Sequence, residues 1–146
     1  MPNIVHRVGI EASQIAVYKA LTKQEGLAGW WTRPNGDGAN VGARMQFIFK
    51  RGGPTMEVIE LVRLKRVRWR CLDGPAEWKN TELTFEIGRF GSETVVLFRH
   101  RGWKAECDFM AHCSCKWAYF LLSLKSLLED GRGTPFPVDR HISEWG

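Results

Sequence analysis

The feature that most constrains the fold of this chain is the stretch from Asp108 to Asp130, DFMAHCSCKWAYFLLSLKSLLED. Its apolar residues recur at spacings of three and four, which places them on one stripe of a helix of about six turns. These residues are Met110, Cys113, Trp117, Phe120, Leu121, Leu124, Leu127 and Leu128. Asp108 is the expected N-cap, and Gly131 is placed to end the helix in the left-handed conformation. So long an amphipathic helix needs a wide apolar surface beneath it.

The residues before this helix supply that surface as a sheet. Residues 3–11 alternate as a strand, with Ile4, His6, Val8 and Ile10 on one face. Ser13 is the expected cap of a short helix, a second short helix covers about 24–31, and 33–42 is a loop rich in Pro, Asn and Gly. Five further strands are expected near 45–50, 55–63, 66–71, 82–87 and 93–102. Short turns separate them, so neighbouring strands should pair antiparallel.

The length of 146 residues suits a single domain, residues 1–146, with an irregular tail over 134–146 where two prolines occur. A hydrophobic share of 44% argues against a disordered chain. No apolar run is long enough for a membrane span, and the N-terminus lacks a signal-peptide pattern. We therefore expect a cytoplasmic protein with four reduced cysteines.

These elements predict an α+β fold. A curved antiparallel sheet of six to seven strands would surround the long C-terminal helix, with two short helices after the first strand. This arrangement buries every apolar face in the pattern.

The motifs resemble those of the helix-grip fold of the START and birch-pollen-allergen superfamily, also called SRPBCC. Residues 10–13 (IEAS), 17–22 (VYKALT) and 27–31 (LAGWW) are similar to the opening of its branch related to the heat-shock-protein ATPase activator. Residues 99–103 (RHRGW) resemble the end of that branch's last strand, and the segment from Trp117 to Lys125 resembles its final helix. Polyketide cyclase and dehydratase-like proteins belong to the same superfamily. The resemblance implies a hydrophobic ligand between sheet and helix, but it carries no single catalytic signature.

We therefore expect a cavity for a hydrophobic or aromatic small molecule, lipid-like or polyketide-like, between the sheet and the C-terminal helix. The expected ligand-binding residues are Phe47, Phe49, Trp69, Leu83, Phe85, Phe98, Met110, Cys113, Trp117 and Phe120. His100 and His6 would be the polar groups of this cavity.

His100 and His6 are also the candidate catalytic residues. Both lie on otherwise apolar strand faces, and the first and last strands are neighbours in the resembled fold. Imidazole transfers protons near neutral pH, so one of the two could serve a cofactor-free cyclase or dehydratase. The alternative is a pair of hydrogen-bonded structural histidines. Binding without catalysis is the leading hypothesis.

No metal site and no cofactor are predicted. Cys107, His112, Cys113 and Cys115 are close in sequence, but Cys113 and Cys115 point to nearly opposite sides of a helix and cannot share a metal. A Cys113 thiol facing the core would also be a poor nucleophile.

The net charge of +5 includes a basic run from Arg63 to Arg70, together with Arg99 and Arg101. The run alternates with buried residues and carries no aromatic on the same face, so we expect a solvated strand face and no nucleic-acid site. The glutamates expected to offset this charge across strands are Glu57, Glu60, Glu82 and Glu86.

Two further partners remain open. Tyr119 and Leu122 lie on the outer side of the long helix and could form a homodimer contact. The resemblance also implies an alternative function, a module that modulates a chaperone ATPase, although the full activator carries an additional domain that this short chain lacks.

Overall fold

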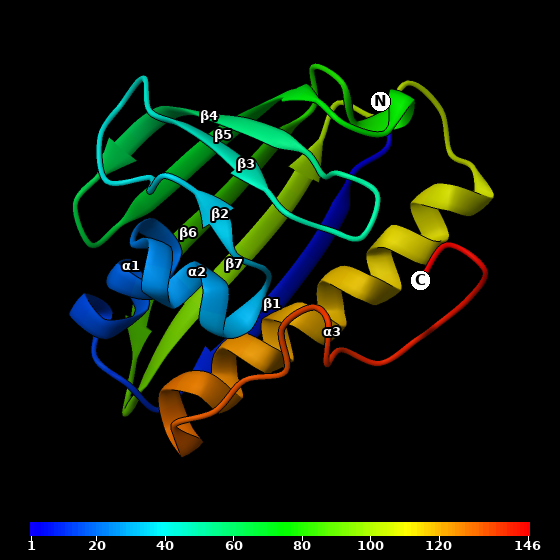
Figure 1. Ribbon diagram of the computed structural model, residues 1–146. Helices are drawn as coiled ribbons and strands as arrows, with labels where there is room; N and C mark the ends of the chain where they lie inside the picture. The colour runs from blue at the N-terminus through cyan, green and yellow to red at the C-terminus, as the bar shows by residue number, and fades with distance from the viewer.

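A seven-stranded antiparallel sheet curls around one long helix in the computed structural model, which describes residues 1–146 (Figure 1). The elements in chain order are β1 (Ile4–Ile10), α1 (Gln14–Thr22), α2 (Gln24–Trp30), β2 (Pro34–Asn35), β3 (Arg44–Phe47), β4 (Thr55–Val62), β5 (Arg66–Asp73), the 3-10 helix η1 (Ala76–Trp78), β6 (Glu82–Phe90), β7 (Glu93–Arg101) and α3 (Asp108–Asp130). The strand order across the sheet is β1-β7-β6-β5-β4-β3-β2. The predicted α+β helix-grip architecture is confirmed.

Two strands differ from the sequence pattern. β2 lies within the segment expected to be a loop, where Pro34 and Asn35 pair with β3. The face of β4 could not be assigned from sequence, and the structure buries Met56 and Val58. A register shift between Val58 and Glu60 interrupts the alternation, which explains the mixed pattern of this strand.

The ends of the helices follow simple hydrogen-bonding rules, with one correction. Ser13 caps α1, because its Oγ accepts from the Ala16 N–H at 3.1 Å. The expected capping of α3 by Asp108 is wrong: Cys107 is the N-cap without a side-chain bond, and Asp108 is the first helical residue. Gly131 ends α3 with a φ of 82°, as expected of a left-handed C-cap. No helix combines the length and apolarity needed to cross a bilayer.

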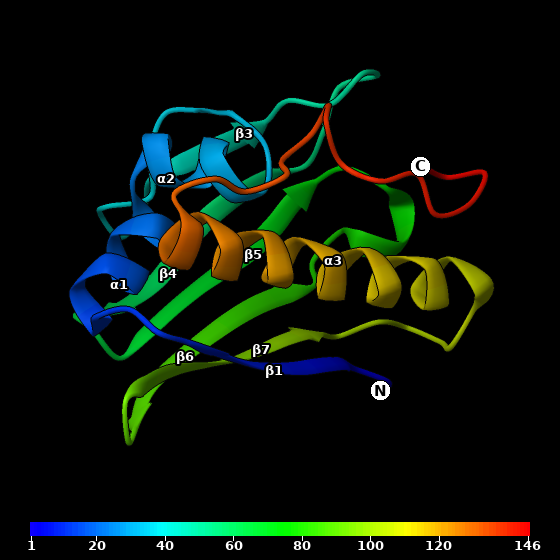
Figure 2. The same cartoon turned by 90° about the horizontal axis from the view of Figure 1, so that it is seen from below.

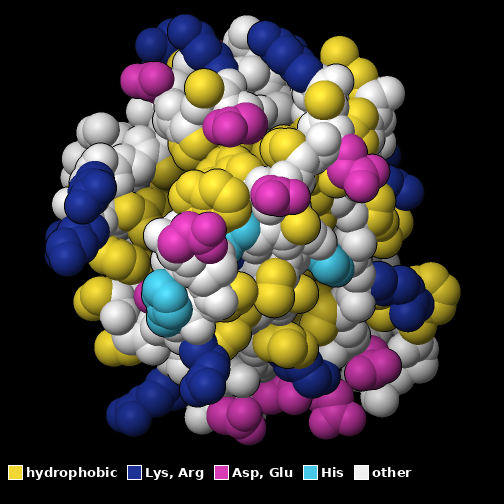
Figure 3. Space-filling view, turned by 90° about the vertical axis from the view of Figure 1, so that its right-hand side faces the viewer, with side chains coloured by type: hydrophobic (Ala, Val, Ile, Leu, Met, Phe, Trp, Pro, Cys, Tyr) yellow, Lys and Arg dark blue, Asp and Glu magenta, His cyan; other side chains and the backbone are white.

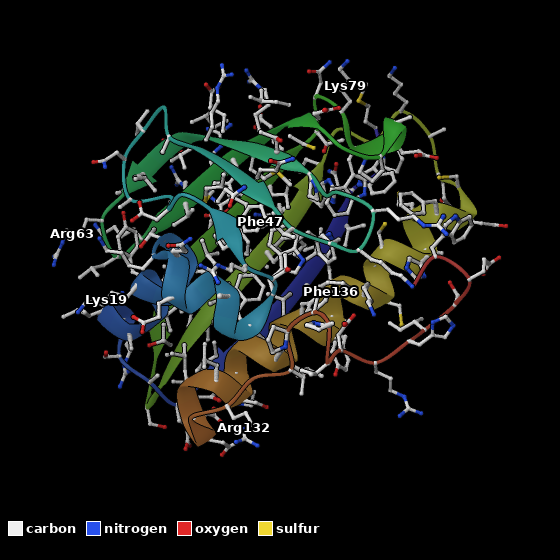
Figure 4. All side chains as sticks on the ribbon, in the orientation of Figure 1. Lys19, Phe47, Arg63, Lys79, Arg132 and Phe136 are labelled. Carbon is white, nitrogen blue, oxygen red and sulfur yellow. The ribbon has the colours of Figure 1, made fainter.

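The long helix has different neighbours along its length. α1 and α2 lie beside its C-terminal half, whereas loops and the chain's own tail lie beside its N-terminal half (Figure 2). Figure 4 shows Phe47 inside the fold, while Lys19, Arg63, Lys79 and Arg132 point outward. The apolar core is therefore continuous under α3, but only one half of the helix is covered by other helices.

The outer face of the sheet carries a ladder of ion pairs. Glu82 accepts from Arg68 at 2.6 Å and from Arg70 at 3.2 Å, and Arg99 donates to Glu86 at 2.8 Å. Burial opposes the shift, but the hydrogen bonds from Arg68 and Arg70 hold the pKa of Glu82 below its usual value. Glu57 and Glu60 pair with arginines in the same way. The predicted cross-strand offset of the basic charges is confirmed for Glu60, Glu82 and Glu86, whereas Glu57 pairs with Arg44 of β3, outside the basic run.

The C-terminal tail forms no helix or strand, as expected, but it has defined contacts. After Gly131 it turns back along α3 toward the N-terminal half of that helix (Figure 1). The Thr134 N–H donates to Ser123 Oγ at 2.7 Å, and the Phe136 N–H donates to the Trp31 carbonyl at 2.8 Å. These bonds attach the tail to the fold beside the candidate site.

Candidate functional site

Aromatic side chains occupy the space between the sheet and the middle of α3. The ring of Trp31 is 4.2 Å from that of Phe47, 4.9 Å from that of Trp117 and stacked at 6.1 Å on that of Trp69, all measured between centroids. Phe98 packs on Trp117 at 4.7 Å. All five side chains are at most 2% exposed. This part of the interior is a packed aromatic core.

A groove of about 1230 Å³ opens beside this core, under the N-terminal half of α3. Its walls come from the β3–β4 loop, the β5–η1 segment, α3 and the tail. The residues that matter most for its chemistry are Trp31, Phe49, Trp78, Phe109, His112, Cys113, Lys116, Trp117, Phe120, Phe136, Asp139 and Trp145. Figure 3 looks at this end of the molecule and shows hydrophobic side chains exposed between acidic side chains and histidines. The groove therefore combines aromatic surface with a polar margin.

The ten predicted ligand-binding residues separate into three groups. Phe49, Cys113, Trp117 and Phe120 line the groove. Those buried in the packed core away from it are Phe47, Trp69, Leu83, Phe85 and Phe98. Met110 lines a second, smaller groove of about 590 Å³ between β1 and the start of α3.

His100 is fully buried and engaged on both ring nitrogens. Trp117 Nε1 donates to His100 Nδ1 at 3.2 Å, so His100 Nε2 carries the proton and donates to Thr81 Oγ1 at 2.8 Å. Thr81 in turn donates to the Trp78 carbonyl at 2.5 Å. Burial lowers the pKa of His100 to about 3. His100 is therefore a neutral link that joins β7, α3 and the η1 segment.

His6 has a different environment from His100. The two positions are diagonal in the β1–β7 ladder, since His6 pairs with Phe98 and Ile4 pairs with His100. His6 is half-buried, and its Nε2 is 3.0 Å from the Ser114 carbonyl and 3.1 Å from Ser114 Oγ. The two imidazoles thus bind separate partners on α3, Ser114 and Trp117.

The tail closes one side of the groove through polar contacts with α3. Lys116 Nζ lies 2.6 Å from Asp139 Oδ2 and donates to the carbonyls of Arg140 and Gly146 at 2.5 and 3.3 Å. One helical turn earlier, His112 Nδ1 is 2.6 Å from Ser143 Oγ. We call these contacts the tail clasp.

Two polar groups of the groove have special environments. Burial raises the pKa of the Cys113 thiol to about 12, so this cysteine is neutral and a poor nucleophile. The Trp78 indole N–H is buried without a hydrogen-bond partner. It lies near the Cys113 thiol and lowers the pKa of that thiol, but burial has the larger, opposite effect. No cluster of three His, Cys, Asp or Glu side chains could hold a metal ion.

The groove also uses residues that sequence reasoning did not assign to a site. Trp31 was part of the motif 27–31 but was not assigned to the cavity, and Trp78 lies between the expected strands 66–71 and 82–87, where no inner face was predicted. Phe136, Asp139 and Trp145 come from the irregular tail, where no periodic pattern indicates an inner face. Only the return of the tail along α3 brings these side chains to the groove.

Comparisons with known proteins place this geometry in context. A family model described as activator of Hsp90 ATPase homolog 1-like protein matches residues 11–129. No curated protein matches the chain significantly. Among solved structures, the Aha1 dimer from Colwellia psychrerythraea is 44% identical, with a TM-score of 0.84 over 91% of this chain and 100% of that one. Protein MLL2253 from Mesorhizobium loti is 17% identical, with a TM-score of 0.79 over 88% and 98% of the two chains. CalU16 from Micromonospora echinospora is 15% identical, with a TM-score of 0.74 over 95% and 76%.

Proposed function

Because the chain belongs to the family of activator of Hsp90 ATPase homolog 1-like proteins, whose fold grips a long helix in a curved sheet, we propose that it binds a hydrophobic or aromatic small molecule in the groove under α3. The observation that carries the proposal is the set of indole rings at the groove. Trp117 stacks on Trp78 at 5.8 Å between centroids and packs on Trp31 at 4.9 Å. Trp31 and Trp117 form the buried floor, whereas Phe49, Trp78 and Phe109 are only partly buried at the groove. Aromatic surface that is accessible from one side is typical of small-molecule sites.

The polar groups of the groove narrow the class of ligand. The buried Trp78 N–H has no partner, and an unsatisfied buried donor gains from an acceptor oxygen. Phe49 and Phe136, whose ring centroids are 5.1 Å apart, add apolar surface to the lining of the groove. A flat aromatic molecule with a carbonyl or phenolic oxygen satisfies both features.

Binding without catalysis has more support than catalysis. His100 uses both nitrogens in hydrogen bonds and has a pKa of about 3, so near pH 7 it stays neutral, takes up no second proton, and keeps its one N–H bonded to Thr81. His6 points to Ser114 and is absent from the lining of the larger groove. A cyclase or dehydratase reaction through either histidine would need these hydrogen bonds to be rearranged.

The test is a melting and fluorescence screen of the purified protein against fatty acids, sterols and flat aromatic ketones or phenols. Ligands that occupy the groove raise Tm with concentration and change indole fluorescence. Trp78→Phe keeps an aromatic ring but removes the N–H. It should therefore weaken the binding of aromatic ketones more than the binding of fatty acids. Phe90→Ala, at a residue 63% exposed outside the groove, is the matched control. The proposal is wrong if no compound class shifts Tm.

A second candidate function rests on the 44% identity with the Aha1 dimer. On that reading the protein modulates the ATPase of an Hsp90-type chaperone. The measurement is the ATPase rate of such a chaperone with and without this protein. An increase in that rate would favour the chaperone function, whether or not the groove binds small molecules.

We also propose a homodimer through the outer side of α3. Leu122 is 56% exposed there and Tyr119 is half-buried, and the 44% identical neighbour is a dimer. Sedimentation of Leu122→Lys against wild type tests this contact, because a charge at its centre would separate the subunits.

We also propose a cytoplasmic location. Cys107 and Cys115 are exposed free thiols, and thiols of this kind stay reduced in that compartment.

A further inference from the structure

One edge of the sheet is formed by β1, which pairs with β7 on one side only (Figure 2). In an antiparallel ladder, alternate residues direct their main-chain groups to the neighbouring strand and to the free edge. Two sets of hydrogen bonds identify which residues of β1 face outward. The Gly9 carbonyl accepts from Lys125 Nζ at 2.5 Å, and the Glu11 N–H donates to Glu129 at 2.8 Å. Both groups lie on odd-numbered residues and bond to α3, not to β7.

A hydrogen bond at the end of β7 leads to the same assignment of outward-facing residues on β1. Gly102 follows β7 and would be paired with residue 2 by continuation of the β1–β7 register. Its N–H points toward the β1 side, where it donates to Asn3 Oδ1 at 3.3 Å. Even-numbered residues of β1 therefore exchange hydrogen bonds with β7. The N–H and C=O groups of Val5 and Arg7 face the free edge.

The free edge is divided into two parts. At its C-terminal end, Lys125 and Glu129 of α3 occupy the outward groups of Gly9 and Glu11. At its N-terminal end, no side chain of the protein bonds to the outward groups of Val5 and Arg7, and Val5 is 49% exposed. An uncovered edge of this kind is a template for another strand.

The second groove runs beside this uncovered part. It has a volume of about 590 Å³, with Ile4 and Val5 on one side and Met110, Ala111 and Ser114 on the other. An extended segment on the edge of β1 would therefore have room between the strand and α3. The groove and the unpaired main-chain groups lie on the same residues, Val5 and its neighbours.

We propose that the β1 edge at Val5 and Arg7 binds an extended peptide segment of a partner protein as an added antiparallel strand. Main-chain bonds to Val5 and Arg7 supply the attachment, as in other cases of strand addition. This surface is separate from the groove under α3, so neither proposal depends on the other.

The charged side chains near the β1 edge indicate which peptide sequence fits best. Exposed Glu106 and Asp108 line the second groove together with Asn3. Arg7 lies outside the groove, farther along the β1 edge, and is exposed with its guanidinium 5.4 Å from the Phe90 ring centroid. An antiparallel strand that fits has an acidic residue opposite Arg7, an apolar residue opposite Val5 and a basic residue opposite Asn3. The pattern is acidic, any, apolar, any, basic, read from the N-terminus of the peptide.

The probe is the acetylated peptide Thr-Glu-Thr-Val-Thr-Lys-Thr. We expect it to shift the amide resonances of Val5 and Arg7 and to slow their hydrogen exchange at least several-fold. Methylation of the peptide's Val amide, which faces β1, should abolish the effect. Methylation of the preceding Thr amide, which faces away, should leave it unchanged. The peptide with Glu and Lys exchanged should bind less tightly. Equal behaviour of the two methylated peptides, or no shift at Val5 and Arg7, overturns the proposal.

Two proline variants test the edge in the protein itself. Val5→Pro removes an outward N–H and leaves the β7 ladder intact, so Tm should change by a few degrees at most while peptide binding is lost. His6→Pro removes an inward N–H and should lower Tm far more. Similar losses of Tm in the two variants would show that the edge was assigned wrongly. A wild-type dimer that Val5→Pro converts to monomer would mean that a second copy occupies the edge, which also overturns the peptide proposal.

Discussion

The two halves of α3 carry the same apolar stripe but lie in different environments. The C-terminal half packs against α2, where Gly29 leaves room for Leu127: a Cβ at Gly29 would lie 3.0 Å from a Leu127 methyl. The N-terminal half faces the groove, with Phe109 and His112 half-buried in its wall. One half is fixed by helix packing, and the other is bordered by loops and the tail.

This difference shows what an amphipathic pattern does and does not determine. The periodicity of α3 identifies the face that turns inward. Whether that face meets packed side chains or an open groove depends on elements that are distant in sequence. Stability should therefore depend on the packed half and binding on the open half, and the following predictions test that division.

The largest effect is expected at Trp117, which lies where the two halves meet. Trp117→Ala removes contacts with Trp31, Phe98 and the His100 imidazole, and it should cost ~3–5 kcal/mol of unfolding free energy. Trp145→Ala, at a residue 51% exposed in the open half, should cost under ~1 kcal/mol. Urea unfolding measures both. Equal losses would contradict the division.

The next effect concerns pH. His100 has a pKa of about 3 in the folded protein and about 6.5 when unfolded, so between these values the unfolded chain binds a proton that the folded chain does not. Stability should therefore fall as pH drops below 6.5, by up to about 1.4 kcal/mol per pH unit from this group. His100→Gln lacks that contribution and should show a shallower decline from pH 6.5 to 4.5. Parallel curves would show that His100 is charged or accessible in the fold.

A smaller effect is expected where α1 meets α2 in the packed region. A Cβ at Gly26 would lie 2.5 Å from the Cα of Ala20, so Gly26→Ala must move a backbone and should cost about 1–3 kcal/mol. In Gly29→Ala the new methyl group meets only the side-chain end of Leu127, and alanine also has the higher helix propensity. The unfolding free energy of this variant should therefore stay within about 1 kcal/mol of wild type. Thermal unfolding of the pair checks this. A gain of stability in Gly26→Ala would show that the helices separate freely.

The smallest effect on global stability is expected at the tail clasp. Lys116→Met removes the contacts with Asp139 and the tail carbonyls, and it should change global stability by under ~1 kcal/mol. Hydrogen exchange in residues 139–146 should nevertheless become faster, because the tail loses its attachment. Lys104→Met, at an exposed lysine, is the control and should leave that exchange unchanged. Unaltered exchange in Lys116→Met would mean that the remaining contacts, which include the His112–Ser143 bond and the packing of Trp145, hold the tail without Lys116.

Much of the fold was predictable from the sequence because it follows from local periodicity. The bounds of α3 agree with the predicted 108–130, and the Ser13 cap and the Gly131 C-cap are in place. The alternation of β5 and β7 also identified their buried faces. β2 was not predicted because a strand of two residues is too short to show an alternating pattern. The N-cap of α3 was assigned to the wrong residue because Cys107 has the extended backbone of a cap but its side chain makes no capping hydrogen bond.

The candidate site was less predictable because it is made by non-local contacts. The sequence placed His100 on an inner face, but nothing in it indicated that Trp117 and Thr81 would occupy both ring nitrogens. Nor could it show that Trp31, from the end of α2, would fill the space between the sheet and Trp117. The volume expected for a ligand is taken by that indole, and the open space lies nearer the tail.

The tail clasp also has a kinetic consequence. It is held in part by an ion pair between Lys116 and Asp139, whose side chains are only 16% and 12% exposed, so salt weakens the pair less than it would weaken an exposed one. Movement of the tail away from α3 exposes both charges to the solvent, so it should become modestly more frequent as salt rises. If a ligand enters past the tail, its association and dissociation rates should rise together with ionic strength while their ratio changes little. The last eight residues of the chain would thereby limit how fast a molecule enters the groove, while the fit of the aromatic walls would still determine its affinity.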